Sequence, residues 1–96
     1  MNIPAQLDGA RVIMYIENDA NHTFTRMLYE EEDGSSNEVL ITRLAIVKYE
    51  QSNEFYLFLC DTNWEVHQDF DMESIEEAIN CSITTFSLND SDWKFL

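Results

Sequence analysis

The sequence predicts an α+β fold in which an antiparallel sheet of about five strands carries one C-terminal helix on one face. Apolar residues recur with the period of strands up to residue 70 and with the period of a helix after residue 74. An apolar fraction of 45% is ample for a core, and 96 residues leave room for only one. We therefore expect residues 1–96 to form a single domain.

The first strands are expected from two loosely alternating stretches, residues 11–17 and 23–29. Residues 19–22 between them are rich in turn formers, so the two stretches are predicted to pair as a half-buried hairpin. Residues 30–37 contain four acids followed by glycine and small polar residues, which is typical of a loop.

The centre of the sheet is predicted to lie in residues 41–50 and 55–60. Residues 44–47 are apolar at consecutive positions, and residues 55–60 are apolar on both faces. Consecutive apolar β-formers are typical of strands that are covered on both sides. Residues 51–53 are short enough to link the two strands as a hairpin.

A further strand is expected at residues 64–70, entered through a turn at residues 61–63. Its apolar and polar side chains alternate: Trp64, Val66 and Phe70 against Glu65, His67 and Asp69. This alternation predicts one buried face and one acidic, solvated face.

The helix is expected to begin after Ser74, which can cap it, with Glu77 completing a capping box. One apolar stripe follows at helical spacing: Ile75, Ala78, Ile79, Ile83 and Phe86. The β-branched Thr84 and Thr85 are expected to fray its end. Residues 90–96 are expected to form a short strand or extended piece that packs back on the core.

Charge is the unusual property of this sequence. Nineteen acidic and five basic residues give a net charge of −14, and no Lys or Arg occurs between Glu50 and Trp93. Solubility alone requires a net charge of only about 2 to 8 in magnitude. The excess predicts a basic partner and excludes nucleic acid and anionic membranes, because both attract Lys and Arg.

A cation site is conceivable at Asp69, Asp71 and Glu73, because hard cations take clustered carboxylates, and a metal-dependent enzyme is then a third hypothesis. A calcium loop also needs a glycine at its sharp turn, and none occurs between Asp61 and Glu77. The pattern therefore favours a solvated strand end that leads into a helix, and no metal or cofactor is expected.

A second motif, Asp61, Asn63 and Glu65, has the spacing of an EF-hand start, but a strand pattern continues through it. His67 is expected on the exposed face beside carboxylates. No nucleophile is predicted on that face, and no Lys or Arg is near to stabilise an oxyanion. Enzymatic activity is therefore not expected.

Cys60 and Cys81 are too few for a disulfide framework, so both are expected to be reduced, half-buried packing residues. The first residues lack the basic and apolar regions of a secretory signal, and no apolar run reaches the ~20 residues of a membrane span. A cytoplasmic location is expected.

Trp64 and Trp93 each have two interpretations. Both are most simply core residues. Each is also flanked by acids, however, and an aromatic ring beside carboxylates is how a binding surface anchors Arg or Lys of a partner.

Residues 54–64 contain a tyrosine–leucine–phenylalanine strand, a Cys-Asp turn and a Trp, and residues 73–78 contain a Ser-x-Glu-Glu-Ala helix start. With residues 46–50 and Trp93, these features resemble small bacterial immunity proteins of contact-dependent and polymorphic toxin systems. The likeness covers roughly residues 44–94, and residues 67–72 depart from it by being more acidic. It implies a protein that binds and neutralises a toxin domain, commonly a nuclease.

The sequence thus predicts an immunity protein whose acidic surface covers a basic toxin domain. The expected contact residues are Asp61, Trp64, Glu65, Asp69, Asp71, Glu73, Glu76 and Glu77. The alternative is a DNA mimic, of phage or plasmid origin, that occupies a DNA-binding enzyme or repressor. Carboxylates along an elongated face would favour the mimic, and a compact patch beside Trp64 would favour the toxin inhibitor.

Overall fold

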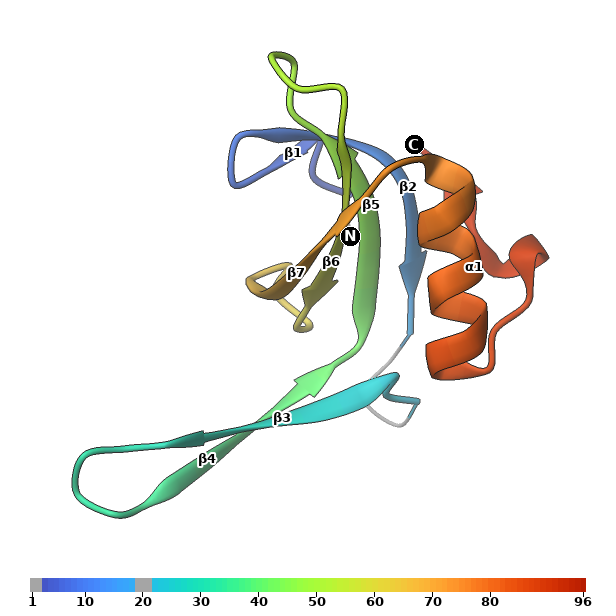
Figure 1. Ribbon diagram of the computed structural model, residues 1–96. Helices are drawn as coiled ribbons and strands as arrows, with labels where there is room; N and C mark the ends of the chain where they lie inside the picture. The colour runs from blue at the N-terminus through green and yellow to red at the C-terminus, as the bar shows by residue number, and fades with distance from the viewer. Residues whose placement is uncertain (1–2, 19–21) are drawn as a thin grey trace.

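The computed structural model describes residues 3–18 and 22–96. Its main sheet is a curled antiparallel sheet, and α1 (Ile75–Phe86) lies against one face of it (Figure 1). The neighbouring strands are, in order, β1 (Gln6–Leu7), β2 (Ala10–Glu17), β5 (Arg43–Lys48), β6 (Phe55–Cys60) and β7 (Val66–Met72), with β8 (Lys94–Phe95) paired to β2. The predicted fold class, an antiparallel sheet with one C-terminal helix, is confirmed.

A two-stranded hairpin, β3 (Thr25–Glu30) and β4 (Ser36–Ile41), projects away from this sheet (Figure 1). The predicted pairing of residues 11–17 with 23–29 is therefore wrong. β2 pairs with β5 instead, with Val12 opposite Val47, and β3 pairs with β4. Residues 19–21 of the expected turn lie outside the described residues.

Burial explains why β2 pairs with β5. β5 is buried on both faces and β2 at every second residue, so pairing them buries far more apolar surface than a β2–β3 hairpin would. Most of β3 and β4 is exposed, which also explains why residues 36–38 carry the polar composition of a loop although they form a strand.

The core has two layers, one on each face of β5 and β6. The helix side contains Leu44, Ile46, Leu57 and Leu59, together with Ala78 and Trp93. The opposite side contains Ala45, Val47, Phe58, Cys60 and Trp64. The expectation that residues 44–47 and 55–60 form central strands is confirmed.

Ser74 caps the helix as expected, but the expected capping box is not complete, because the Glu77 carboxylate takes the amide of Glu73 rather than that of Ser74. Ser74 Oγ accepts a hydrogen bond from the Glu77 amide at 3.0 Å, and Glu77 Oε2 accepts one from the Glu73 amide at 3.0 Å. The expected fraying at Thr84 and Thr85 is wrong. The helix continues to Phe86, because that ring packs edge-on against Phe24 with centroids 5.9 Å apart.

The C-terminal segment packs back on the core only in part: Asp90–Asp92 form the short 3-10 helix η1 and Lys94–Phe95 form β8, while Phe95 and Leu96 are exposed. Trp93 is buried, and its Nε1 donates to Ser82 Oγ at 2.9 Å. Both cysteines are free thiols; Cys81 is half-buried, whereas Cys60 is buried completely. In the described part of the chain, no helix has the length and hydropathy that a membrane crossing requires.

Candidate functional site

Five predicted contact residues form one band along the open side of the main sheet. We call this band the acidic edge: Asp69, Asp71, Glu73, Glu76 and Glu77. It runs from β7, the last strand of the sheet, into the first turn of α1. All five side chains are exposed. These carboxylates thus lie on consecutive, exposed parts of the chain, the aspartates on β7 and Glu76 and Glu77 on α1.

The two aspartates lie on the sheet face away from the helix. Asp69 is opposite Phe58 and Asp71 is opposite Tyr56, and directly opposed residues of antiparallel strands point to the same face. Phe70, between them, points to the helix side, where it is 40% exposed. It lines an open groove of about 490 Å³ with Met27 of β3 and residues of α1.

The charge of the acidic edge is not neutralised locally. Within residues 3–18 and 22–96, the ion pairs join Arg26 to Glu38, Arg43 to Glu17 and His67 to Asp61, and none involves an edge carboxylate. The negative potential affects a neighbouring group. The pKa of the Tyr56 hydroxyl is raised, first by desolvation and then by the charges of Asp71 and Glu54.

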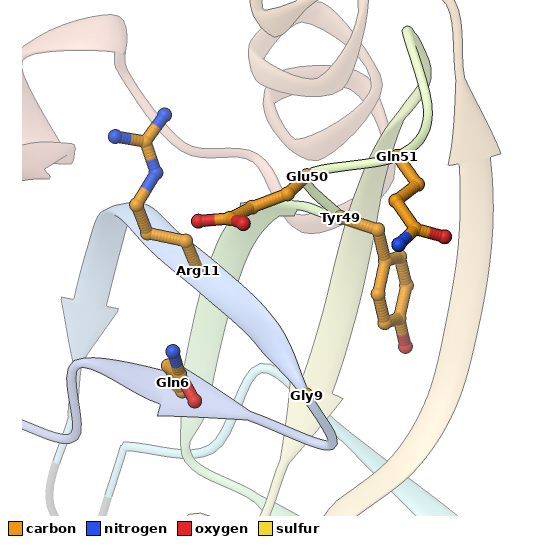
Figure 2. Close-up of a pocket in the computed structure, with 6 residues that line it drawn as sticks. All are labelled: Gln6, Gly9, Arg11, Tyr49, Glu50 and Gln51. Carbon is orange, nitrogen blue, oxygen red and sulfur yellow. The ribbon is translucent and has the colours of Figure 1, made fainter.

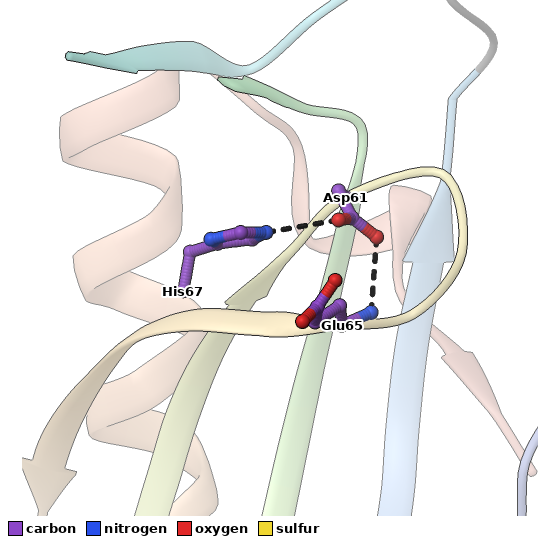
Figure 3. Close-up of side chains that lie close together, drawn as sticks. All are labelled: Asp61, Glu65 and His67. Carbon is purple, nitrogen blue, oxygen red and sulfur yellow. Dashed lines mark hydrogen bonds and ion pairs between the residues drawn. The ribbon is translucent and has the colours of Figure 1, made fainter. Parts of the chain in front are cut away.

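Asp61 and Glu65 lie at the other end of β7, beside His67 (Figure 3). His67 Nε2 lies 2.9 Å from Asp61 Oδ2, and Asp61 Oδ1 accepts the amides of Asn63 and Glu65 at 2.8 and 3.0 Å. One donor atom from each of Asp61, Glu65 and His67 lies within 4.8 Å of the others. The carboxylate of Asp61 therefore organises the turn that leads into β7.

These contacts set the ionisation of Asp61. Desolvation pushes its pKa upward, but the hydrogen bonds from His67 and from the amides of Glu65 and Asn63 outweigh it. The net result is a pKa below the ordinary value of an aspartate, so Asp61 is an anion at neutral pH.

His67 is half-buried, with 16% of its side chain exposed, so the expectation of a solvated face is wrong at this position. The register between β6 and β7 shifts here: Leu59 is opposite Gln68 but Cys60 is opposite Val66, which leaves His67 as the bulged residue. A bulge re-aims the side chain that it carries. Strict alternation along the sequence therefore misplaces His67.

Tyr29 also belongs to this cluster, which no local sequence pattern predicts. Its hydroxyl lies 3.2 Å from His67 Nδ1, and the two ring centroids are 6.0 Å apart. Tyr29 comes from β3 of the projecting hairpin, 38 residues earlier in the chain. Only the folded position of that hairpin brings the two rings together.

Trp64 does not lie on the surface. It is 7% exposed and belongs to the core layer opposite the helix, packed edge-on against Tyr15 at 6.4 Å. Its backbone has φ 64°, which non-glycine residues seldom adopt, and its amide closes the turn by donating to the Asp61 carbonyl at 3.0 Å. The core interpretation holds for Trp64 and equally for Trp93, which is 6% exposed.

No protein-family model, curated protein or solved structure matches this chain. What it does must therefore be argued from its own charges, exposed surfaces and hollows.

Of the other hollows, one lies apart from the acidic edge and one adjoins it. An open hollow of about 340 Å³ lies beside the β1–β2 turn, where Arg11, Tyr49 and Glu50 line it (Figure 2). Another of about 210 Å³ adjoins Asp69 and His67 on the sheet face away from the helix. The second is continuous with the acidic edge, so a partner's side chain could enter it beside Asp69.

Proposed function

We propose that this protein is an immunity protein that binds a basic toxin domain, such as a nuclease, through the acidic edge. The observation that carries the proposal is the band of five exposed carboxylates along β7 and the start of α1, with no ion pair to any of them among the described residues. It lies in a stretch of sequence without Lys or Arg. Carboxylates in that state are available to a partner.

The chemistry of a nuclease matches such a surface. An enzyme that holds phosphates must be basic around its active site, and carboxylates can accept two parallel hydrogen bonds from one guanidinium. Opposite potentials also steer the two proteins together, with association rate constants of up to ~10⁸–10⁹ M⁻¹s⁻¹ at low salt. An inhibitor that protects its own cell requires that speed.

Phe70, rather than Trp64, is the aromatic residue that this surface offers. It is 40% exposed between Asp69 and Asp71 and points to the opposite side of β7. A partner that covers β7 would meet the carboxylates of Asp69 and Asp71 on one face of the strand. On the other face it would meet the ring of Phe70 beside the groove. A buried aromatic surrounded by charge pairs is the usual composition of a binding hot spot.

A DNA mimic is the second candidate, and one observation favours it. Asp69 and Asp71 follow one face of β7, and the patch beside Trp64 that would favour a toxin inhibitor is missing, because Trp64 is buried. Side chains two residues apart on a strand repeat every ~6.6 Å, so Asp69 and Asp71 present regularly spaced charges on one face. A mimic would displace DNA from a DNA-binding enzyme or repressor.

Co-expression tests the proposal. A candidate nuclease toxin domain, sought in the gene that neighbours this protein's own, is expressed with wild-type protein or with either of two triple variants. The edge variant carries Asp69→Lys, Asp71→Lys and Glu73→Lys; the control variant carries Glu30→Lys, Glu31→Lys and Glu32→Lys at the tip of the projecting hairpin. Both variants change the net charge equally, and Glu77 is left intact because its carboxylate holds the Glu73 amide at the start of the helix.

Wild-type and control proteins are expected to restore growth, and the edge variant is expected to fail while keeping the fold and oligomeric state of the wild type. Rescue by the edge variant would contradict the proposal. Displacement of DNA from a DNA-binding enzyme, without protection against the toxin, would establish the mimic in its place.

A further inference from the structure

We propose that Asp61, Glu65 and His67 form a binding site for a divalent transition-metal ion of the zinc class. This inference is independent of the proposed partner and concerns the opposite end of β7 from the start of α1. Oxygen donors from two carboxylates and one imidazole nitrogen lie within 4.8 Å of one another. All three residues come from a single turn and the strand that follows it (Figure 3).

The spacing of the donors suits such an ion. With Zn–N near 2.0–2.1 Å and Zn–O near 2.0–2.2 Å, two ligands of a tetrahedral ion lie ~3.3 Å apart. His67 Nε2 and Asp61 Oδ2 are 2.9 Å apart, so they need to separate by only ~0.4 Å. The exposed carboxylate of Glu65 supplies the third ligand by a rotation of its side chain, and water completes the set.

Both inner ligands are already oriented by other groups. The backbone amides of Asn63 and Glu65 hold Asp61 Oδ1, which leaves Oδ2 directed at His67. On the other side of the imidazole, the Tyr29 hydroxyl lies 3.2 Å from Nδ1. An outer partner on the second ring nitrogen is the usual companion of a metal-bound histidine, because it fixes the tautomer and the ring plane.

The protons balance in a simple way. An ion on Nε2 requires an imidazole whose single proton lies on Nδ1, where it is donated to the oxygen of Tyr29. A neutral histidine with its proton on Nε2 changes tautomer, and a charged one releases a proton to solvent. As ligands, the two carboxylates bind the ion in their deprotonated form, and its charge offsets theirs.

The donor set also selects the kind of ion. One imidazole and two carboxylates suit zinc, nickel or cobalt, because sites that contain a nitrogen ligand bind these ions with high affinity. Calcium takes six to eight oxygen ligands, and magnesium retains most of its waters. The site is therefore expected to prefer Zn²⁺ strongly over Mg²⁺ and Ca²⁺.

The ion would also act on the projecting hairpin. Tyr29 belongs to β3, and its contact with His67 joins that hairpin to the turn before β7. Metal binding leaves the proton of His67 on Nδ1, which then donates to the Tyr29 hydroxyl oxygen. Binding is therefore expected to strengthen the contact between Tyr29 and His67. Amide hydrogen exchange in β3 and β4 is expected to slow when Zn²⁺ is bound.

Calorimetry with ZnCl₂ on the purified full chain tests the site. Wild-type protein is expected to bind one Zn²⁺, and His67→Gln and Glu65→Gln are expected to weaken binding at least tenfold. Glu65→Gln is the safer variant, because its carboxylate is exposed and holds no turn in place. Tyr29→Phe is expected to lower the affinity for Zn²⁺ about 10- to 100-fold, because it removes the outer partner of His67.

Asp69→Asn and Cys81→Ser are the matched controls, and both are expected to bind Zn²⁺ as the wild type does. Failure of the wild type to bind, or unchanged binding by both His67→Gln and Glu65→Gln, would overturn the inference. Equal binding of Mg²⁺, or an equal loss in Asp69→Asn, would overturn it too, because either result indicates diffuse attraction to an acidic surface.

Discussion

The guanidinium carbon of Arg43 lies 5.5 Å from the ring centroid of Trp64, and both side chains are buried. Arg43 Nη1 also donates to the Asn18 carbonyl at 2.8 Å and lies 3.6 Å from a carboxylate oxygen of Glu17. A desolvated cation over an indole ring contributes about 2 kcal/mol. The arrangement joins β5 to the end of β2 and to the turn before β7, so Trp64 serves stability.

Replacing Trp64 is expected to destabilise the protein. Trp64→Ala removes a large buried ring together with its contacts to Arg43 and Tyr15, and should lower the free energy of unfolding by about 3–5 kcal/mol in urea titrations. Leu28→Ala, at a position 72% exposed, is expected to stay within about 0.5 kcal/mol of wild type. Wild-type stability in Trp64→Ala, combined with lost partner binding, would restore Trp64 as a surface anchor.

The hydroxyl of Ser82 is expected to contribute to the stability of the folded protein. Its hydroxyl accepts from Trp93 Nε1 at 2.9 Å and donates to the Ile79 carbonyl at 2.7 Å, inside the core. Ser82→Ala leaves the buried indole N–H without its acceptor, and should cost about 1–3 kcal/mol in thermal or urea unfolding. The exposed Ser91→Ala is the comparison, and equal stability of the two variants would refute this role.

The two thiols are expected to differ in reactivity. Burial first, and then the charges of Asp61 and Asp8, raise the pKa of the Cys60 thiol to about 12. Because the thiolate is the reactive form, Cys60 should resist iodoacetamide at pH 8 in the native protein and react in urea. Mass spectrometry of the modified peptides reads both sites, with Cys81 as the internal reference. If Cys60 were modified in the folded protein as fast as in urea, the claim that burial protects this thiol would be contradicted.

Asp61 is expected to stabilise the protein in a pH-dependent way. Its folded-state pKa is lowered, so its contribution is present above the unfolded value of about 3.9 and is lost as pH falls through the folded value. The difference in unfolding free energy between wild type and Asp61→Asn, measured with EDTA present, should be large near pH 6 and shrink toward pH 2. A difference that grows on acidification would have the wrong sign.

The sequence predicted those parts of the fold that local pattern determines. Residues 55–60 could be recognised as a covered strand and Ser74 as a helix cap, because composition and spacing alone decide both. The partner of β2 could not be found in this way. Long-range burial selected β5, whereas proximity along the chain favoured residues 23–29.

The candidate site was predictable to the same extent. The acidic edge follows from acidic residues that alternate along a strand and continue into a helix start, so charge located it. The bulge at His67 and the approach of Tyr29 depend on register and on the position of a distant hairpin, and neither is expressed in local sequence. Trp64 shows the converse: flanking acids suggested exposure, and the fold buried it.

The proposed role of the acidic edge is tested most directly by the rate at which the protein associates with the proposed toxin domain. Stopped-flow association, measured across a range of NaCl concentrations, should be fast at low salt and slow steeply as salt rises. The edge variant, with Asp69, Asp71 and Glu73 changed to Lys, should associate at least tenfold more slowly than the Glu30, Glu31 and Glu32 variant of equal net charge. A rate independent of salt, or equal rates for the two variants, would contradict the account.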